Sequence, residues 1–364
     1  MNRLRWVDTG RGVAIILVAV FHSTNWLLAV GFDLDAAVRV NLVLSSVRMP
    51  LFFAISGLFA AKWLDGQWRP LLRQKVILFL WVYAIWEIIG AAITYYGNGL
   101  NGDRGSIPAV IRHLMLSPVV PRFELWFIWA LAIFFVAAKL SRRVDPRLQL
   151  GIAGIISLIA LSGWDAPNVG WGGSLKYYAF FLAGIYLREQ IFAFARIRRP
   201  VLMAGVIVAW AASSSVLVIF DLQVVPGLYF LNCVLGLLAG VCLGRALSGV
   251  SLIPYLGSRT LPIYLAHTPI IVSIALLLSV VDAVDSVSSP WIYGLAPVLA
   301  VMAIGLSMLL NRLAVSHGLS WLYEPPTLVV KMLGLAGPRR AAGARARRSG
   351  DPSSMSDSAP GKTG

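Results

Sequence analysis

The segment RWVDTGRGVAIILVAVFHSTNW, residues 5–26, combines an apolar run of membrane-spanning character with ionisable side chains. Similar apolar runs recur along the 364 residues, of which 58% are hydrophobic and only 13% charged. A run of ~20 apolar residues is long enough to cross the hydrocarbon core of a bilayer as a helix. The apolar residues are continuous and do not alternate, which favours helices over barrel strands. The composition therefore predicts an all-α, polytopic membrane helical bundle.

The positions of the basic residues predict how the helices are oriented. Hydropathy places about ten transmembrane helices at 12–31, 41–61, 76–96, 124–138, 148–164, 173–187, 201–220, 227–244, 261–281 and 291–311. If alternate connections face the cytoplasm, they hold 25 of the 31 Lys and Arg residues. The remaining six are Arg39, Arg48, Arg104, Arg112, Arg122 and Lys176. Because cytoplasmic loops are rich in Lys and Arg, this arrangement predicts that both termini are cytoplasmic.

The net charge of +15 therefore reflects the orientation of the helices in the membrane. For this reason we expect no nucleic-acid partner. Asp8 and His22 lie where a signal peptide would have its basic and apolar regions, so we expect the first helix to be retained. The stretch 97–123 contains Gly, Asn and Pro and is expected to be an external loop. We expect residues 1–334 to form one transmembrane domain, and 335–364, poor in hydrophobic residues, to form a disordered basic and Ser-rich cytoplasmic tail.

Asp8, Arg11 and His22 share one stripe of the first predicted helix. At 100° per residue, Arg11 and His22 lie within ~20° of each other and His22 is ~16 Å deeper in the membrane. A stripe with an acid, a base and an imidazole is expected to face protein or water. Taken singly, Arg11 could be an interfacial anchor, Asp8 a helix N-terminal charge, and His22 a ring bonded to a neighbouring carbonyl.

Arg48 lies in the second predicted helix at the same depth as His22, to within ~3 Å. The short connection 32–40 makes these two helices antiparallel neighbours, so both side chains can face one cavity. Pro50 is expected to disturb the backbone hydrogen bonds beside Arg48. The alternative for Arg48 is snorkelling to the outer interface.

Glu87 and His267 are two further ionisable residues within predicted helices. A carboxylate at the position of Glu87 must be protonated or paired, and Arg48 is its expected partner. His267 is expected in the cytoplasmic half of its helix, where it either approaches a ligand or bonds a facing helix. No metal or disulfide framework is predicted, because the two cysteines, Cys233 and Cys242, lie on opposite faces of one helix.

Five segments together resemble the membrane acyltransferase-3 family. They are RWVDTGRGVAIILVAVFHS (5–23), RMPLFFAISG (48–57), ELWFIWAL (124–131), KYYAFFLAGIYL (176–187) and LGSRTLPIYLAHTPI (256–270). Each is a weak apolar pattern alone, but their order and spacing resemble the family over residues 5–313. The chain is most similar to the short branch that includes fucose 4-O-acetylase-like and glucan succinyltransferase-like proteins.

The resemblance implies transfer of an acyl group, usually acetyl, from cytoplasmic acyl-coenzyme A to a sugar hydroxyl of a cell-surface or exported glycan. It implies that His22 is the catalytic histidine and Arg48 a site residue, and it places Asp8 and Arg11 at the cytoplasmic entrance. His267 matches a histidine late in the family pattern and is a candidate for binding the acyl donor. The roles of Glu87 and Glu124 are left open. The implied location is the cell (inner) membrane, as a multi-pass protein surrounded by lipid.

The chemistry of acyl transfer needs a base, an oxyanion donor and a path for the thioester. The imidazole of His22 is expected to supply the base, either by deprotonating the acceptor directly or by first carrying the acyl group. Arg48 is expected to hold the thioester oxygen or the acceptor. Arg11, and with less weight Arg69, Arg73 and Lys75, are candidates for the phosphates of coenzyme A. The alternative is a proton-coupled transporter or flippase, in which the same ionisable residues would relay protons.

Overall fold

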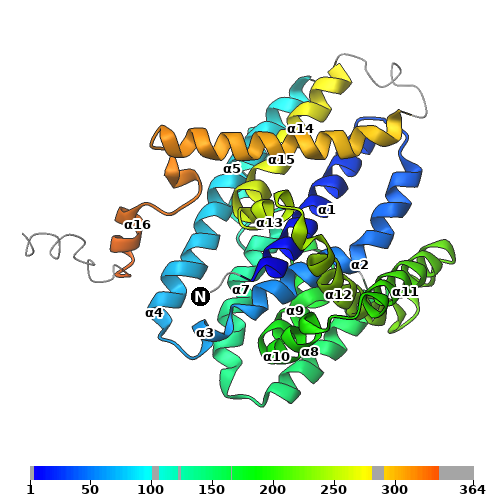
Figure 1. The fold of residues 1–364 in the computed structure, drawn as a ribbon. Coiled ribbons are helices and arrows are strands. Elements are labelled where there is room, and N and C mark those ends of the chain that lie inside the picture. Colours follow the sequence, from blue (N-terminus) through cyan, green and yellow to red (C-terminus); the bar gives the residue numbers. More distant parts are fainter. Residues whose placement is uncertain (1–3, 101–105, 122–123, 165, 281–290, 336–364) are drawn as a thin grey trace, which may run out of the picture.

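The computed structural model describes residues 4–100, 106–121, 124–164, 166–280 and 291–335, and all regular structure in these ranges is helical (Figure 1). The longer helices are α1 (Arg5–Ala29), α2 (Asp35–Leu58), α5 (Ile77–Leu100), α6 (Ile107–Leu116), α7 (Trp126–Leu140), α8 (Pro146–Leu161), α9 (Val169–Tyr186), α10 (Arg188–Arg196), α11 (Pro200–Ile219), α12 (Leu228–Ala246), α14 (Thr260–Val280) and α15 (Ile292–Ser316). The shorter elements are α3 (Ala61–Leu64), α4 (Trp68–Leu71), the π-helical turn η1 (Leu72–Val76), α13 (Leu252–Gly257), α16 (Thr327–Met332) and the 3₁₀ turns η2 (Ser141–Arg143), η3 (Leu222–Val224), η4 (Leu247–Gly249) and η5 (Ser320–Leu322). The predicted disordered tail lies outside the described residues from 336 onward.

Each of the ten predicted transmembrane segments coincides with a helix. Within the described ranges, seven helical segments are long and apolar enough to cross a membrane: Arg5–Ala29, Asp35–Leu58, Trp68–Gly97, Pro200–Ile219, Leu228–Gly249, Thr260–Val280 and Ile292–Ser316. The other three predicted segments are the helices α7, α8 and α9, of 15, 16 and 18 residues. The all-helical polytopic membrane bundle is thus confirmed.

Helix α1 runs through the middle of the bundle and contacts α2, α12, α13, α14 and α15 (Figure 1). Helix α2 packs in turn on α9, and glycines allow these two helices to approach closely. A Cβ atom added at Gly184 would lie 2.0 Å from the carbonyl oxygen of Ala54, and one added at Gly57 would lie 2.1 Å from that of Phe181. Small residues at such crossings are typical of packed membrane helices. The crossing fixes α9 against α2, which itself contacts α1.

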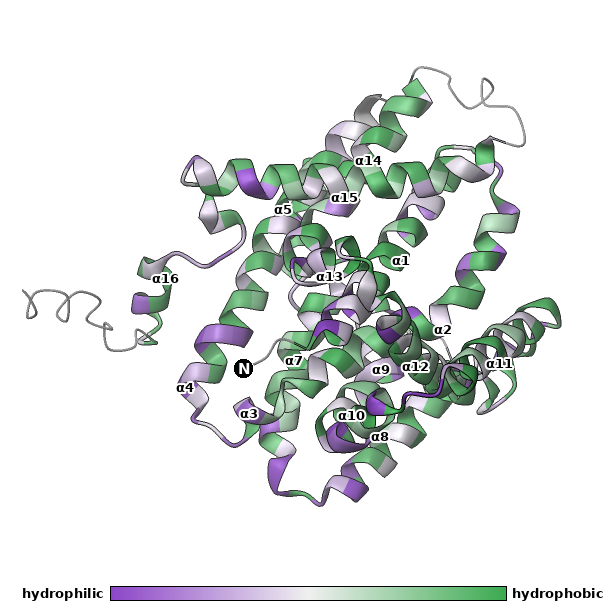
Figure 2. Cartoon of the chain, viewed as in Figure 1, coloured by the Kyte–Doolittle hydropathy of each residue, from purple (hydrophilic) through white to green (hydrophobic). Residues whose placement is uncertain are grey.

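The outer faces of the bundle are apolar, as a lipid environment requires. Large hydrophobic side chains are exposed along whole helices, for example Ile152, Ile155 and Ile159 on α8 and Val201 and Val208 on α11. Figure 2 shows hydrophilic residues gathered around α3, α10 and the turn between α7 and α8, at one end of the bundle. These segments hold many of the basic residues that the charge pattern assigns to the cytoplasmic side.

One local expectation needs correction. The stretch 97–123 is not a simple loop, because α5 extends to Leu100 and α6 forms at Ile107–Leu116. The hydroxyl of Ser106 caps α6 by accepting from the backbone N–H of Ala109, and Pro108 fits the first turn, where no N–H partner is needed. Pro50 lies inside α2, which continues through it to Leu58.

Candidate active site

A cavity of about 570 Å³, here named the outer cavity, opens between α1, α2, α9 and the start of α7. His22, Arg48, Glu124 and Lys176 are among its lining residues. His22 and Arg48 therefore line one cavity, as their matched depths predict. Asn168 fixes another part of the wall: its side chain caps α9 and donates a 2.7 Å hydrogen bond to the carbonyl of Pro121.

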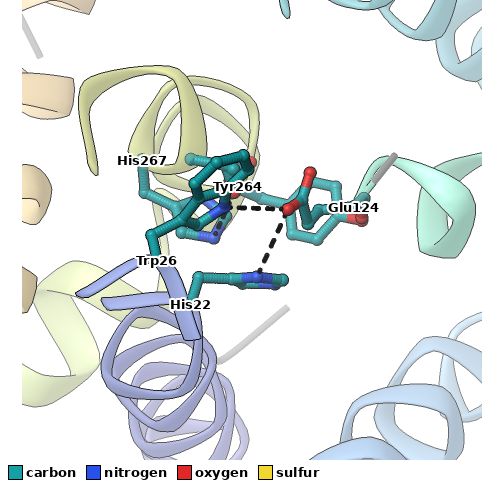
Figure 3. A network of polar contacts seen from close by, with 6 residues as sticks. His22, Trp26, Glu124, Tyr264 and His267 are labelled. Atoms are coloured by element: carbon teal, nitrogen blue, oxygen red, sulfur yellow. Dashed lines mark hydrogen bonds and ion pairs between the residues drawn. The ribbon is translucent and has the colours of Figure 1, made fainter. Parts of the chain in front are cut away.

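A carboxylate from a distant part of the sequence reaches the imidazole of His22. The Nδ1 atom of His22 lies 3.9 Å from Oε1 of Glu124, which precedes α7 (Figure 3). The indole N–H of Trp26, one turn after His22 on α1, donates to the same oxygen at 3.1 Å. Trp26 thereby holds the carboxylate toward the ring. If Nδ1 carries a proton toward Glu124, Nε2 keeps a lone pair and can act as a base.

His267 lies directly beside His22, with 5.3 Å between the ring centroids. Its Nδ1 donates to the backbone carbonyls of Ile263 and Tyr264, at 3.0 and 2.8 Å. A neutral ring with a proton on Nδ1 has an accepting Nε2, to which the hydroxyl of Thr268 donates at 3.2 Å. His267 is 1% exposed and packs against His22. Its geometry therefore fits a residue that supports His22 better than one that holds the acyl donor.

Arg48 is a buried cation, 6% exposed, on the wall of the outer cavity. Its guanidinium lies over the ring of Phe21 at 4.1 Å, a cation–π contact that orients it. Its Nη1 atom has no hydrogen-bond partner, and it forms no ion pair among the described residues. An unpaired buried charge is costly, so Arg48 is suited to a partner that a substrate provides.

A second cavity of about 220 Å³, the inner cavity, lies at the Arg11 end of α1. Arg11 and Lys75 are its basic lining residues, and most of the remaining wall is aromatic or aliphatic. Lys75 belongs to the π-helical turn η1, a kind of local distortion that is frequent at functional sites. Asp8, in contrast, lies where α1 meets α13 and is not part of the described lining of either cavity.

The wall between the two cavities is thin. Consecutive residues of α7 face opposite ways: Trp126 lines the outer cavity and Phe127 the inner cavity. Tyr264 lines the inner cavity, and its hydroxyl donates to the backbone carbonyl of Glu124, which lines the outer one (Figure 3). The pair of His22 and Glu124 therefore stands next to the partition, on its outer side.

The structure corrects the expected partner of Glu87. Its Oε1 lies 3.2 Å from Nε2 of His113, on α6, and not next to Arg48. Depth in the membrane does not decide which face of a helix a side chain occupies, and Glu87 of α5 faces α6. Glu87 and Glu124 both line a smaller cavity of about 30 Å³ together with Trp26 and Trp86.

The sequence alone leaves the role of Glu124 open and indicates no site role for Trp26, Tyr264 or Lys176. A signal for Glu124 was present, since it is an acid next to the apolar run of α7. Its contact with His22 depends on how α1 and α7 pack. No group of three or more His, Cys, Asp or Glu side chains that could hold a metal ion occurs in the described part of the chain.

An imidazole with a carboxylate 3.9 Å from its Nδ1 atom, next to a partition between two cavities in a membrane bundle, is an arrangement suited to transferring a group between two substrates. The protein is a membrane-embedded acyltransferase by family. The acyltransferase-3 model, described as an acyltransferase domain, matches residues 4–312, so the chain belongs to that family and the resemblance is confirmed.

One curated relative is informative. The chain is 22% identical over 288 residues to the inner membrane protein YcfT of Escherichia coli (strain K12), and the alignment covers 72% of this chain and 78% of the relative. No solved structure matches the chain.

Proposed function

We propose that this enzyme moves an acyl group, acetyl in the simplest case, from cytoplasmic acyl-coenzyme A to a hydroxyl of a cell-surface or exported glycan. The single observation behind this proposal is the pair of His22 and Glu124 beside a thin partition between two cavities. The name of the Escherichia coli relative supports a location in the inner membrane.

The inner cavity has features suited to the acyl donor. Coenzyme A carries phosphates, and Arg11 and Lys75 are the cations on the lining of this cavity. Arg11 also lies 5.1 Å from the ring centroid of Phe59, which limits its orientation. The aromatic and aliphatic wall suits an uncharged arm that brings a thioester toward Phe127 and Tyr264.

The outer cavity has features suited to a sugar. Its lining combines aromatic rings, Trp126 and Tyr177, with polar side chains such as Asn168. Ligand sites of this kind use aromatic surfaces for contact area and a few polar groups for orientation. The volume of about 570 Å³ leaves room for an acceptor beside His22.

In the direct reaction, Nε2 of His22 takes the proton of the acceptor hydroxyl while Glu124 holds the Nδ1–H side of the ring. The hydroxyl oxygen attacks the thioester carbonyl, a C–O bond forms and the C–S bond breaks. The proton held by His22 then passes to the leaving thiolate, which yields the free thiol of coenzyme A. Arg48 donates hydrogen bonds to the oxygen that becomes negative during the attack.

The test uses the purified protein in detergent with radiolabelled acetyl-coenzyme A and an extract of envelope glycans. We expect His22→Ala to reduce acyl transfer about 100-fold or more, the usual contribution of a general base. His317→Ala is the matched control, since His317 is exposed at the end of α15. Undiminished transfer by folded His22→Ala protein would contradict the proposal.

A further inference from the structure

We propose that the acceptor is acidic and that its carboxylate or phosphate binds Lys176 in the outer cavity. This inference rests on the proposed function, because it names the chemistry of the acceptor. It follows from the charges around the outer cavity and from the position of Lys176 within the fold.

The lining of the outer cavity has an excess of positive charge. Arg48 and Lys176 are both on it, and Glu124 is the one acid among the described lining residues. Glu124 is already engaged, since its Oε1 receives the indole N–H of Trp26 and faces His22. Asp165 lies outside the described residues, so this balance refers to the lining that the structure describes. A low-dielectric cavity of one sign concentrates ligands of the other sign.

Lys176 lies where the outer cavity meets another one. A cavity of about 310 Å³, here named the side cavity, shares Lys176 and Tyr177 with the outer cavity. Lys176 is half-buried in α9, seven residues after the start of that helix at Val169, and so ~10 Å along it. No hydrogen bond or ion pair of its ammonium group occurs among the described contacts.

The side cavity offers room and polar groups for the remainder of such an acceptor. Ser45, Gln223 and Tyr229 line it, and the hydroxyl of Tyr229 lies 2.5 Å from that of Ser45. A glycan with its reacting hydroxyl at His22 would extend past Lys176 into this cavity. The ammonium group would then contact an anionic group next to the acylated sugar, with an energy typical of a charge-assisted hydrogen bond.

The competing explanation for Lys176 is that its ammonium group snorkels to the outer membrane interface. In that case its charge would serve topology alone, and substitution would leave the choice of acceptor unchanged. The two explanations predict different effects of substituting Lys176, so the acyl content of the glycan made by a Lys176 variant decides between them.

The experiment compares envelope glycans from a deletion strain complemented with the wild-type protein, Lys176→Gln, Lys176→Arg or Lys331→Gln. Lys331 is exposed on α16 and provides the matched control. Glycans are fractionated by anion exchange, and the acyl increment is measured by mass spectrometry, which also separates carboxylate from phosphate. The amount of each protein variant in the membrane is measured through an affinity tag.

We expect the acyl groups in the retained, anionic fraction, on fragments that carry a carboxylate or phosphate. Lys176→Gln should lower the acyl content at least fivefold, while Lys176→Arg and Lys331→Gln stay within twofold of wild type. Acyl groups found on neutral fragments, or equal acylation by Lys176→Gln and Lys331→Gln, would overturn the inference alone. An unchanged acyl content on deletion would instead overturn the proposed function.

Discussion

The Nδ1 atom of His22 lies 3.9 Å from Oε1 of Glu124, and the indole of Trp26 donates to that same oxygen. Residues from α1 and from the segment before α7 are thereby joined on the wall of the outer cavity. The carboxylate faces Nδ1, whereas Nε2 is the ring nitrogen that would accept a proton. This geometry makes Glu124 the residue whose substitution is most informative after His22.

Glu124→Gln should reduce kcat for acyl transfer about 100-fold, because an amide neither stabilises the protonated imidazole nor fixes its tautomer as a carboxylate does. The measurement is the rate of thiol release from acetyl-coenzyme A with a glycan acceptor. Glu324→Gln, an exposed carboxylate beyond α15, serves as the control. Equal rates for the two variants would show that Glu124 does not assist His22.

Arg11→Gln should raise the KM for acyl-coenzyme A about tenfold and leave the KM for the acceptor unchanged. A charge-assisted hydrogen bond to a phosphate contributes about 1.5–3 kcal/mol, and Arg11 lines the inner cavity but not the described wall of the outer one. Initial rates with each substrate varied in turn separate the two constants. Arg143→Gln, exposed in η2, is the control, and a change confined to the acceptor KM would contradict the assignment.

Gly184→Ala should destabilise the bundle by about 2 kcal/mol or more, because the added methyl group would lie 2.0 Å from the carbonyl oxygen of Ala54. The Tm in detergent should fall by several degrees. Gly205→Ala is the matched control, since a Cβ at that position of α11 meets no atom within 4 Å. An equal Tm for both variants would mean that α2 and α9 are not tightly packed at Gly184.

Lys139→Met should reduce the free energy of unfolding by about 2 kcal/mol, because hydrogen bonds are lost. The Tm should fall accordingly. Lys139 is 2% exposed, and its ammonium group donates to the carbonyls of Trp63, Leu64 and Gly66, the first at 3.2 Å. Methionine fills a similar volume but leaves these carbonyls without that donor. Lys331→Met, on the exposed surface of α16, should leave the Tm unchanged.

The helices were predictable because hydrocarbon imposes a strong constraint on sequence. Backbone groups must be bonded within each segment, so long apolar runs leave few alternatives to helix. The shared cavity of His22 and Arg48 was also predictable. A short connection makes α1 and α2 antiparallel neighbours, and this fixes the relative depths of the two side chains.

Contacts between distant segments were not predictable in this way. The partner of Glu87 is His113, which lies on a helix inside the stretch expected to be a loop. Ser106 and Pro108 are local start signals of that helix, but the expectation of a loop rests on the Gly, Asn and Pro content of the stretch and does not use them. The approach of Glu124 to His22 depends on the rotation of packed helices about their axes, which hydropathy does not encode.

The partition formed by Trp126, Phe127 and Tyr264 gives the proposed reaction a direction. In that reaction free coenzyme A leaves on the side from which its acylated form entered, and the ester remains on the opposite side. A two-carbon unit would then cross the permeability barrier by bond exchange, while neither of the large molecules that exchange it has to be translocated.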